Sequence, residues 1–411
     1  MRRRLVSEKR CSVSVREDVE VAMLKPGTIQ SLPELPAPLL TIYLDTNLAK
    51  QTSRGLRPDY LTRFESQAKL IAETVPTGDL PLFLQQVQRA DAYLKNHPLQ
   101  CRGAVIFAGH YTWELIPLQV EVEDEVRWGA PALAQLFWQL DEHKPYGIVL
   151  VGQKRAQIFL WWLGEMLELE EKEFRMGPSK VKEMGPVSRT AGVRVSRGKD
   201  HDVYEHHVDA QYAHYHKQIA EHVDRWCAAE HLDSLFVVGL VEMAKGVQRE
   251  LPQGLREKTT VIDADLGWVV SRAELQKRIE PFIERYEHER EKVLIDGLLG
   301  DSRAVVIGID ETLVQLQQGR IRNLTVVKGL DGSLRQCLKC SWADRTQDPA
   351  CPACGGERQA VRLREVLPLL ARRYNVSVEV VSGEAASRLQ QAGGMGAWLR
   401  ETAKKEYAQS S

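Results

Sequence analysis

Four cysteines towards the C-terminal end constrain the fold of this 411-residue chain more than any other feature. They form two C-x2-C pairs separated by ten residues: Cys337 and Cys340, then Cys351 and Cys354. A two-residue gap lets both thiolates of a pair face one ion, and the glycines after the second pair allow a tight turn. Four thiolates suit a closed tetrahedral zinc site. We therefore predict a structural zinc site in an insert over residues 335–358, which is too short to have its own core.

The alternatives for these cysteines are four reduced thiols or a redox pair. The chain has seven cysteines, and the other three, Cys11, Cys101 and Cys227, are scattered. This usage favours a reducing compartment with one metal site over a disulfide framework. The basic N-terminal stretch lacks the apolar run of a secretory signal, and no window approaches 18 uninterrupted apolar residues. We therefore expect a cytoplasmic protein without a membrane span.

The composition excludes binding to nucleic acid through overall charge, because the net charge is only −1. Any such function must come from a local patch. The length and the 43% hydrophobic content are sufficient for two or three globular domains.

Strand-like and helix-like segments alternate along the chain, which predicts an α/β fold. Short apolar runs predict buried strands at residues 39–45, 102–109, 146–152 and 155–162, and helical spacing predicts helices at 60–74, 80–94 and 204–226. Asp310 is expected to cap a further helix that ends near Gly319. We divide the chain into a flexible arm (1–37), an N-terminal α/β domain (38–143), a central domain (144–270) with a basic loop (175–203), and a C-terminal domain (271–403).

The basic loop is the strongest local charge feature. Residues 175–199 contain seven lysines and arginines against one glutamate, in a chain that is otherwise nearly neutral. Such a segment can bind RNA phosphates and become ordered on contact; the alternative is a solvated surface loop. The candidate RNA-binding residues are Lys180, Lys182, Arg189, Arg194, Arg197, Gly198 and Lys199. Several histidines and tyrosines follow on the next helix, where core packing is favoured over RNA contact or metal binding.

Several segments carry a family resemblance. "GIDETLVQLQQGRIRNLTVVKGL", the cysteine insert and "LREVLPLLARRYNVSVEVVSGEAASRLQQAGGMGAWLR" resemble the C-terminal domain of the archaeo-eukaryotic class 1 peptide release factor and Pelota superfamily. Upstream, "LLTIYLD", "RGAVIFAG" and "YGIVLVGQKRAQIFLWWLGE" follow in that family's order. The resemblance covers roughly residues 38–403 and is greatest for the bacterial branch of release-factor homologues, which includes hibernation factors.

The resemblance implies a three-domain architecture: an RNase H-like central domain and an α/β sandwich C-terminal domain that bears the zinc-ribbon insert. It also implies a tRNA-shaped ligand of the ribosomal A site. The first domain would lie near the decoding centre, and the central domain would reach the peptidyl-transferase centre and its rRNA. The C-terminal domain would contact the stalk base or a translational GTPase. We expect a monomer off the ribosome.

Class 1 release factors carry Gly-Gly-Gln in the loop before the long central helix, where the glutamine helps to position a water on the peptidyl-tRNA ester. Residues 175–207 of this chain contain no glutamine, and lysine cannot offer the paired donor and acceptor of an amide. We therefore predict no catalytic residues, and a factor that occupies the A site of stalled or dormant ribosomes in rescue or hibernation. The alternative is a peptidyl-tRNA hydrolase with a non-standard loop. A nuclease is disfavoured, because the central strands lack the carboxylates that would hold magnesium.

Overall fold

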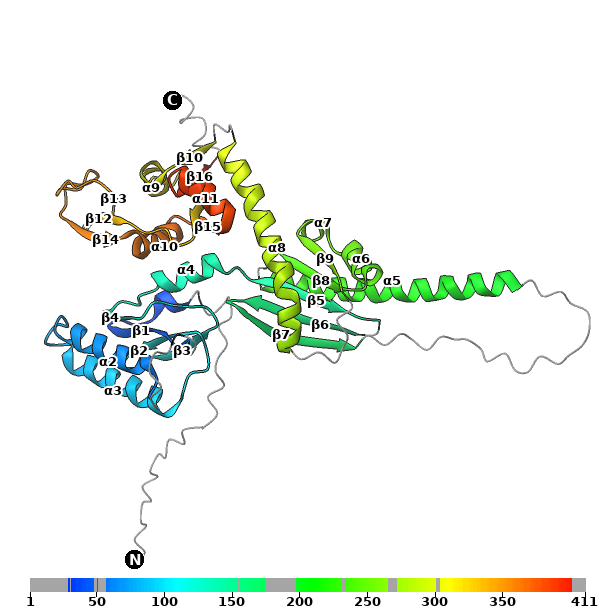
Figure 1. Ribbon diagram of the computed structural model, residues 1–411, viewed down its shortest axis with the longest axis horizontal. Coiled ribbons are helices and arrows are strands. Elements are labelled where there is room, and N and C mark those ends of the chain that lie inside the picture. Colours follow the sequence, from blue (N-terminus) through cyan, green and yellow to red (C-terminus); the bar gives the residue numbers. More distant parts are fainter. Residues whose placement is uncertain are drawn as a thin grey trace, which may run out of the picture. The chain divides into compact units, whose positions relative to one another are not determined.

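The computed structural model describes residues 29, 31–47, 50, 57–153, 155–173, 197–230, 232, 234–264, 272–300 and 304–400. The chain divides after Pro131 into two compact units, which we call unit 1 and unit 2. Figure 1 shows the helices and strands of each.

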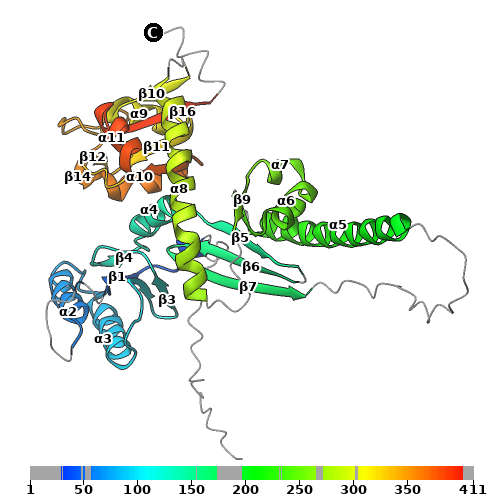
Figure 2. The same ribbon diagram turned by 45° about the vertical axis from the view of Figure 1, so that its right-hand side comes forward.

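Unit 1 is an antiparallel sheet covered by two helices. Its strands are β1 (Leu39–Asp45), β2 (Gly103–Ala108), β3 (Trp113–Leu118) and β4 (Glu125–Gly129), in the order β3-β2-β1-β4. Helices α2 (Asp59–Ala72) and α3 (Leu80–Asn96) lie beside each other on one side of this sheet (Figures 1 and 2), and a short 3-10 turn (Leu32–Glu34) precedes β1. Apolar residues at helical spacing, among them Phe64 and Phe83, pack between the helices and the sheet.

The central sheet of unit 2 has five strands. They are β5 (Tyr146–Val151), β6 (Arg155–Trp162), β7 (Glu165–Glu173), β8 (Leu235–Gly239) and β9 (Thr259–Asp263), in the spatial order β7-β6-β5-β8-β9. Strands β5, β8 and β9 are parallel to one another, and β6 is antiparallel to both of its neighbours, β5 and β7. Placing the first strand in the middle, with the third and fifth at the edges, is the order of RNase H-like sheets.

Helices α5 (Arg197–Ala229), α6 (Val241–Glu250) and the short α7 (Gln253–Arg256) accompany this sheet. Tyr215, Ile219 and Val223 of α5 are buried, as the predicted stripe requires. Gly147 in β5 is needed where α5 passes, because a Cβ there would lie 2.9 Å from the ring of Trp226. Side chains thus attach the second half of α5 firmly to the central sheet.

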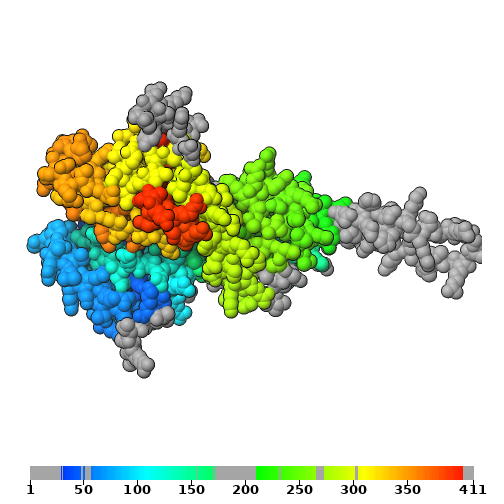
Figure 3. Space-filling model, turned by 45° about the horizontal axis from the view of Figure 1, so that its top comes forward, coloured from blue at the N-terminus to red at the C-terminus, as the bar shows by residue number. Residues whose placement is uncertain are grey.

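The C-terminal sheet is mixed and has the order β10-β16-β11-β15. Its strands are β10 (Val305–Ile307), β11 (Ile321–Val327), β15 (Ser377–Val381) and β16 (Met395–Leu399). Its helices are α4 (Ala134–Glu142), α8 (Arg272–Leu299), α9 (Ile309–Gln317), α10 (Leu363–Arg373) and α11 (Gly383–Gln391). Helix α4 packs on α10, and the space-filling view shows α11 (red) against α8 (yellow) (Figure 3).

Helix α8 serves two cores. Leu275, Ile279 and Ile283 in its first half pack on the central sheet, while Ile295 and Leu298 pack on the C-terminal sheet. A small third sheet in unit 2 surrounds the cysteines; its strands are β12 (Ser333–Cys337), β13 (Ala343–Asp344) and β14 (Arg358–Arg362), in the order β13-β12-β14.

The structure confirms the predicted α/β class with its separate sheets, and it differs from the sequence-based expectations in three places. Helices α4 and α6 were not predicted. Helix α5 begins at Arg197, seven residues earlier than expected, so the end of the predicted basic loop is helical. Asp310 does not cap α9: it lies inside the first turn, after Gly308, and its carboxylate pairs with Arg345. None of the described helices is long and apolar enough to cross a membrane.

Candidate functional site

The cysteine insert brings four sulfur atoms to one point. The Sγ atoms of Cys337, Cys340, Cys351 and Cys354 all lie within 4.8 Å of one another. The separations are 3.5 Å between Cys337 and Cys354, 3.6 Å between Cys340 and Cys351, and 3.4 Å between Cys340 and Cys354. Disulfide sulfurs lie about 2 Å apart, so none of these pairs is bonded. Four sulfurs about 2.3 Å from one zinc ion would be separated by about 3.8 Å, which is close to the observed spacing.

The two C-x2-C pairs sit in equivalent backbone turns. After the first pair, the Ser341 N–H donates to the Cys337 carbonyl (3.0 Å), and Ser341 has a left-handed φ of 64°. After the second pair, the Gly355 N–H donates to the Cys351 carbonyl (2.8 Å), and Gly355 has a φ of 70°. The C-x2-C spacing therefore closes two matching knuckles around a common centre.

The surroundings of the sulfurs favour a thiolate at Cys337, whereas desolvation and the neighbouring sulfurs raise the pKa of the Cys340 thiol. The N–H groups of Cys340 (3.5 Å) and Lys339 (3.3 Å) point at the Cys337 sulfur and lower the pKa of that thiol to about 6. The backbone at Gly356 approaches closely, since a Cβ there would lie 3.0 Å from the Cys337 sulfur and 3.3 Å from that of Cys354. These four residues fit a metal ion, and four protein ligands leave no open position for a reacting water or substrate. A structural role for this centre, with zinc as the metal, stays a prediction.

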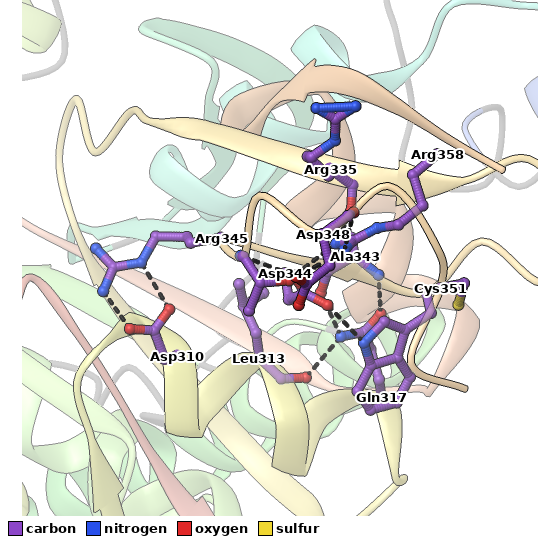
Figure 4. A network of polar contacts seen from close by, with 12 residues as sticks. Asp310, Leu313, Gln317, Arg335, Ala343, Asp344, Arg345, Asp348, Cys351 and Arg358 are labelled. Carbon is purple, nitrogen blue, oxygen red and sulfur yellow. Dashed lines mark hydrogen bonds and ion pairs between the residues drawn. The ribbon is translucent and has the colours of Figure 1, made fainter. Parts of the chain in front are cut away.

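A buried arginine supports the loop between the two knuckles. The Arg358 side chain is fully enclosed, and the residue as a whole is 4% exposed. Its guanidinium donates to the Asp344 carboxylate (2.5 Å), the Arg335 carbonyl (2.8 Å) and the Asp348 carbonyl (3.1 Å) (Figure 4). This network supplies an interior for a small sheet that has few apolar side chains to bury.

Helix α9 attaches the insert to the C-terminal sheet at two points. At the end of the helix, the buried Gln317 amide donates to the Ala343 carbonyl (2.8 Å) and accepts from the Ala343 N–H (2.7 Å). At the beginning, Asp310 forms a two-pronged ion pair with Arg345, which lowers the pKa of the Asp310 carboxyl (Figure 4). The sequence analysis missed these contacts, because polar residues far apart in sequence give no periodic signal.

The candidate RNA-binding residues lie at and before the beginning of α5 in the sequence. Lys180, Lys182, Arg189 and Arg194 lie outside the described residues. Arg197, Gly198 and Lys199 are placed on the first turn of α5, and their side chains are not described.

The structure shows the role of some of the α5 tyrosines and histidines, for which the sequence left core packing, RNA contact and metal binding open. Tyr215 is buried, and its hydroxyl donates to the Gly152 carbonyl (2.8 Å). Burial also raises the pKa of this phenol. His216 stacks beside Tyr212, with 6.2 Å between ring centroids, and covers the α carbon of Gly246 in α6. At these positions packing is the observed role.

Part of the chain matches a known protein family. Residues 131–280 match the model of bacterial archaeo-eukaryotic release factor family 10. This range begins at the boundary of unit 2, contains the whole central sheet with α5, and ends within α8. A search of curated proteins gives no match.

Among solved structures, the chain is similar to the archaeal translation termination factor aRF1, with 15% identity over 92% of this chain and 99% of that one (TM-score 0.24). It is also similar to Archaeoglobus fulgidus Pelota, with 14% identity over 72% and 79% (TM-score 0.29). For Dom34 of S. cerevisiae the identity is 10% over 72% and 80% (TM-score 0.37). Superpositions with such scores carry no functional detail. The family match is the firmer finding: residues 131–280 of this chain are similar to a bacterial archaeo-eukaryotic release factor family.

Proposed function

We propose that this protein binds the ribosome and occupies its A site in stalled or dormant ribosomes, without hydrolysing peptidyl-tRNA. The observation that carries the proposal is the position of the basic segment. It lies between β7 and α5, inside the region that matches a release factor family. Release factors act in translation, so the ribosome is the partner that this family suggests.

The basic segment leads directly into α5, and the second half of this helix is anchored in the core. Tyr215, Ile219 and Val223 hold the second half of α5 in the core, and the Tyr215 hydroxyl ties the helix to the end of β5. Seven basic residues against one glutamate in residues 175–199 give a charge suited to RNA phosphates. A polyanionic surface such as rRNA is the ligand expected for such a segment.

The chemistry of the segment argues for binding over hydrolysis. A release factor needs its glutamine amide beside the ester, and residues 175–207 offer none. The nearest downstream glutamine, Gln211, lies on the helical backbone of α5. The described cysteine centre has a closed set of ligands and supplies no site for an activated water. The proposed mechanism is therefore steric, with rescue and hibernation as the two settings that it fits and a translational GTPase as a proposed partner.

The test is co-sedimentation of the full-length protein with purified 70S ribosomes. Wild type is compared with a variant in which Arg189, Arg194, Arg197 and Lys199 are changed to alanine, and peptide release from loaded peptidyl-tRNA is measured in parallel. We expect binding that weakens with salt and in the variant, because a protein that neutralises fewer phosphates releases fewer counterions when it binds. We expect no release above background. Release by the wild type would instead identify a peptidyl-tRNA hydrolase, and failure to sediment at low salt would reject the proposed function.

A further inference from the structure

Unit 1 presents one aromatic ring almost wholly to solvent. Tyr111 is 91% exposed, more than any other large apolar side chain in the described part of the chain. It lies at the tip of the turn between β2 and β3, which is closed by a hydrogen bond from the Gly109 N–H to the Thr112 carbonyl (2.9 Å). His110 meets the tyrosine edge-on, with 4.2 Å between ring centroids and an interplanar angle of 80°. The Tyr111 ring is therefore open to solvent and contributes little to the core.

A row of stacked side chains stands beside this turn, and we call it the ladder. Arg89 and Tyr93 are four positions apart on one face of α3, and His97 is the residue that directly follows the helix. Trp113 of β3 joins them: the Arg89 guanidinium lies 4.6 Å from its ring centroid, and Tyr93 lies 5.2 Å away. His97 stacks on Tyr93 at 4.4 Å with nearly parallel rings.

The ladder fixes the turn that carries Tyr111. An Arg89 Nη1 atom donates to the Thr112 carbonyl (3.4 Å), directly after Tyr111. Trp113, which follows in the chain, is held between Arg89 and Tyr93. Tyr111 is thus an exposed ring on a turn whose backbone is held in place, so little backbone freedom is lost when a ligand stacks on the ring.

The polar groups of the ladder and the turn suit a phosphate backbone, because a guanidinium is positively charged and imidazole N–H groups can donate hydrogen bonds. The ladder and the turn contain one guanidinium and two imidazoles, and none of their members is acidic. Glu114 points away from Trp113, because neighbouring residues of a strand face opposite sides of the sheet. The acidic group of unit 1 around Asp45 lies at the other end, since Asp45 pairs with Gly103 at the start of β2 and the turn follows its end.

We propose that Tyr111 is a stacking site for an unpaired nucleobase of RNA, with Arg89 and His97 beside the adjoining phosphates. Every base has a π-face, so the site would accept single-stranded or looped RNA without strong sequence preference. The identity of that RNA as ribosomal or messenger RNA rests on the function proposed above. The stacking itself rests on unit 1 alone, and the two can be tested separately.

The first experiment measures fluorescence anisotropy of a labelled single-stranded oligoribonucleotide of about 12 nucleotides. The full-length protein is used with the four alanine changes in the basic segment, so that unit 1 dominates binding. We expect Tyr111→Ala to weaken binding by about 5- to 150-fold, because stacking on an aromatic ring has that effect, and Tyr111→Phe to stay within about twofold. Phe282→Ala is the matched control, because Phe282 is also an exposed aromatic (37%) with an arginine nearby, but it lies on α8. Equal affinity of Tyr111→Ala and its parent, or equal losses for Tyr111→Phe and Tyr111→Ala, would overturn the stacking site.

The second experiment places the site on the ribosome by ultraviolet crosslinking of the wild type, followed by mass spectrometry of crosslinked peptides. A crosslink between RNA and Tyr111 supports the proposal. A Tyr111→Ala variant that loses ribosome binding but keeps full affinity for the oligoribonucleotide would show a protein partner instead and reject the RNA site. Wild-type protein that binds the oligoribonucleotide through Tyr111 but does not sediment with ribosomes would reject the proposed function and leave the stacking site standing.

Discussion

The unit 1 sheet and the cysteine insert are both small antiparallel sheets, and they are stabilised by different means. In β1 (Leu39–Asp45) six of the seven residues are buried, and two helices cover one side of the sheet. In β14 (Arg358–Arg362) the buried residue is an arginine, and the remaining side chains are exposed or half-buried. Unit 1 therefore depends on the hydrophobic effect, whereas the insert has a polar network and four cysteines that can hold a metal ion. This contrast leads to three predictions about stability.

Loss of the metal should have the largest effect, and that effect should be confined to the insert. We expect about one zinc ion per chain by elemental analysis, and its loss in Cys340→Ser or after chelation. Structural zinc supplies on the order of 10 kcal/mol or more to small folds, so residues 333–362 should lose amide protection in hydrogen exchange. Unit 1 should keep its protection under the same conditions. An insert that stays protected without metal would contradict the assignment of a structural centre.

The second prediction is that unit 1 can be destabilised while the insert stays intact. Phe83 is fully buried in α3 and meets Trp128 edge-on, with 5.5 Å between ring centroids. Phe83→Ala should destabilise unit 1 by about 3–5 kcal/mol, because apolar surface is no longer buried and a cavity remains. Denaturant unfolding measured by hydrogen exchange should show this effect in unit 1 only, with zinc content unchanged. The exposed Tyr111→Ala is the control and should change stability by less than about 0.5 kcal/mol.

The smallest effect is expected at the exposed tie between the insert and α9. Arg345 stabilises the Asp310 carboxylate and lowers its folded pKa below the ordinary value of 3.8. The ionised form thus favours the folded state; its contribution is complete above the unfolded pKa and is lost as the pH falls through the lower folded pKa. Because both side chains are about half exposed, we expect Asp310→Asn to cost about 0–1 kcal/mol at neutral pH.

This difference between Asp310→Asn and wild type should vanish towards about pH 2 in a series of denaturant titrations. Asp296→Asn provides a comparison, because it breaks another exposed arginine pair, that of Asp296 with Arg388, away from the insert. If Asp310→Asn changed stability equally at all pH values, the ion pair would not be the source of the effect.

The sequence predicted the features whose signal is local. The C-x2-C pairs depend on residues three positions apart, and the buried strand at residues 39–45 is a continuous apolar run, so both were apparent before the structure. Helix α4 was missed because nine residues give little periodicity, and its role emerges only on packing against α10. Asp310 was assigned as a cap because its partner, Arg345, is 35 positions away. The ladder follows the same rule: its α3 residues are regularly spaced, but Trp113 comes from a different strand.

The two attachments on α9 also restrict how the insert can move. Asp310 and Gln317 are seven positions apart, or about 10 Å along the helix axis. A single contact at either end would leave the insert free to swivel, but two contacts at that distance define a line, and strands β12 and β14 fix the rotation about it. We therefore expect an insert with bound metal to move together with α9 as one rigid body. Without the ion, we expect these two attachments to hold a loosely folded segment instead.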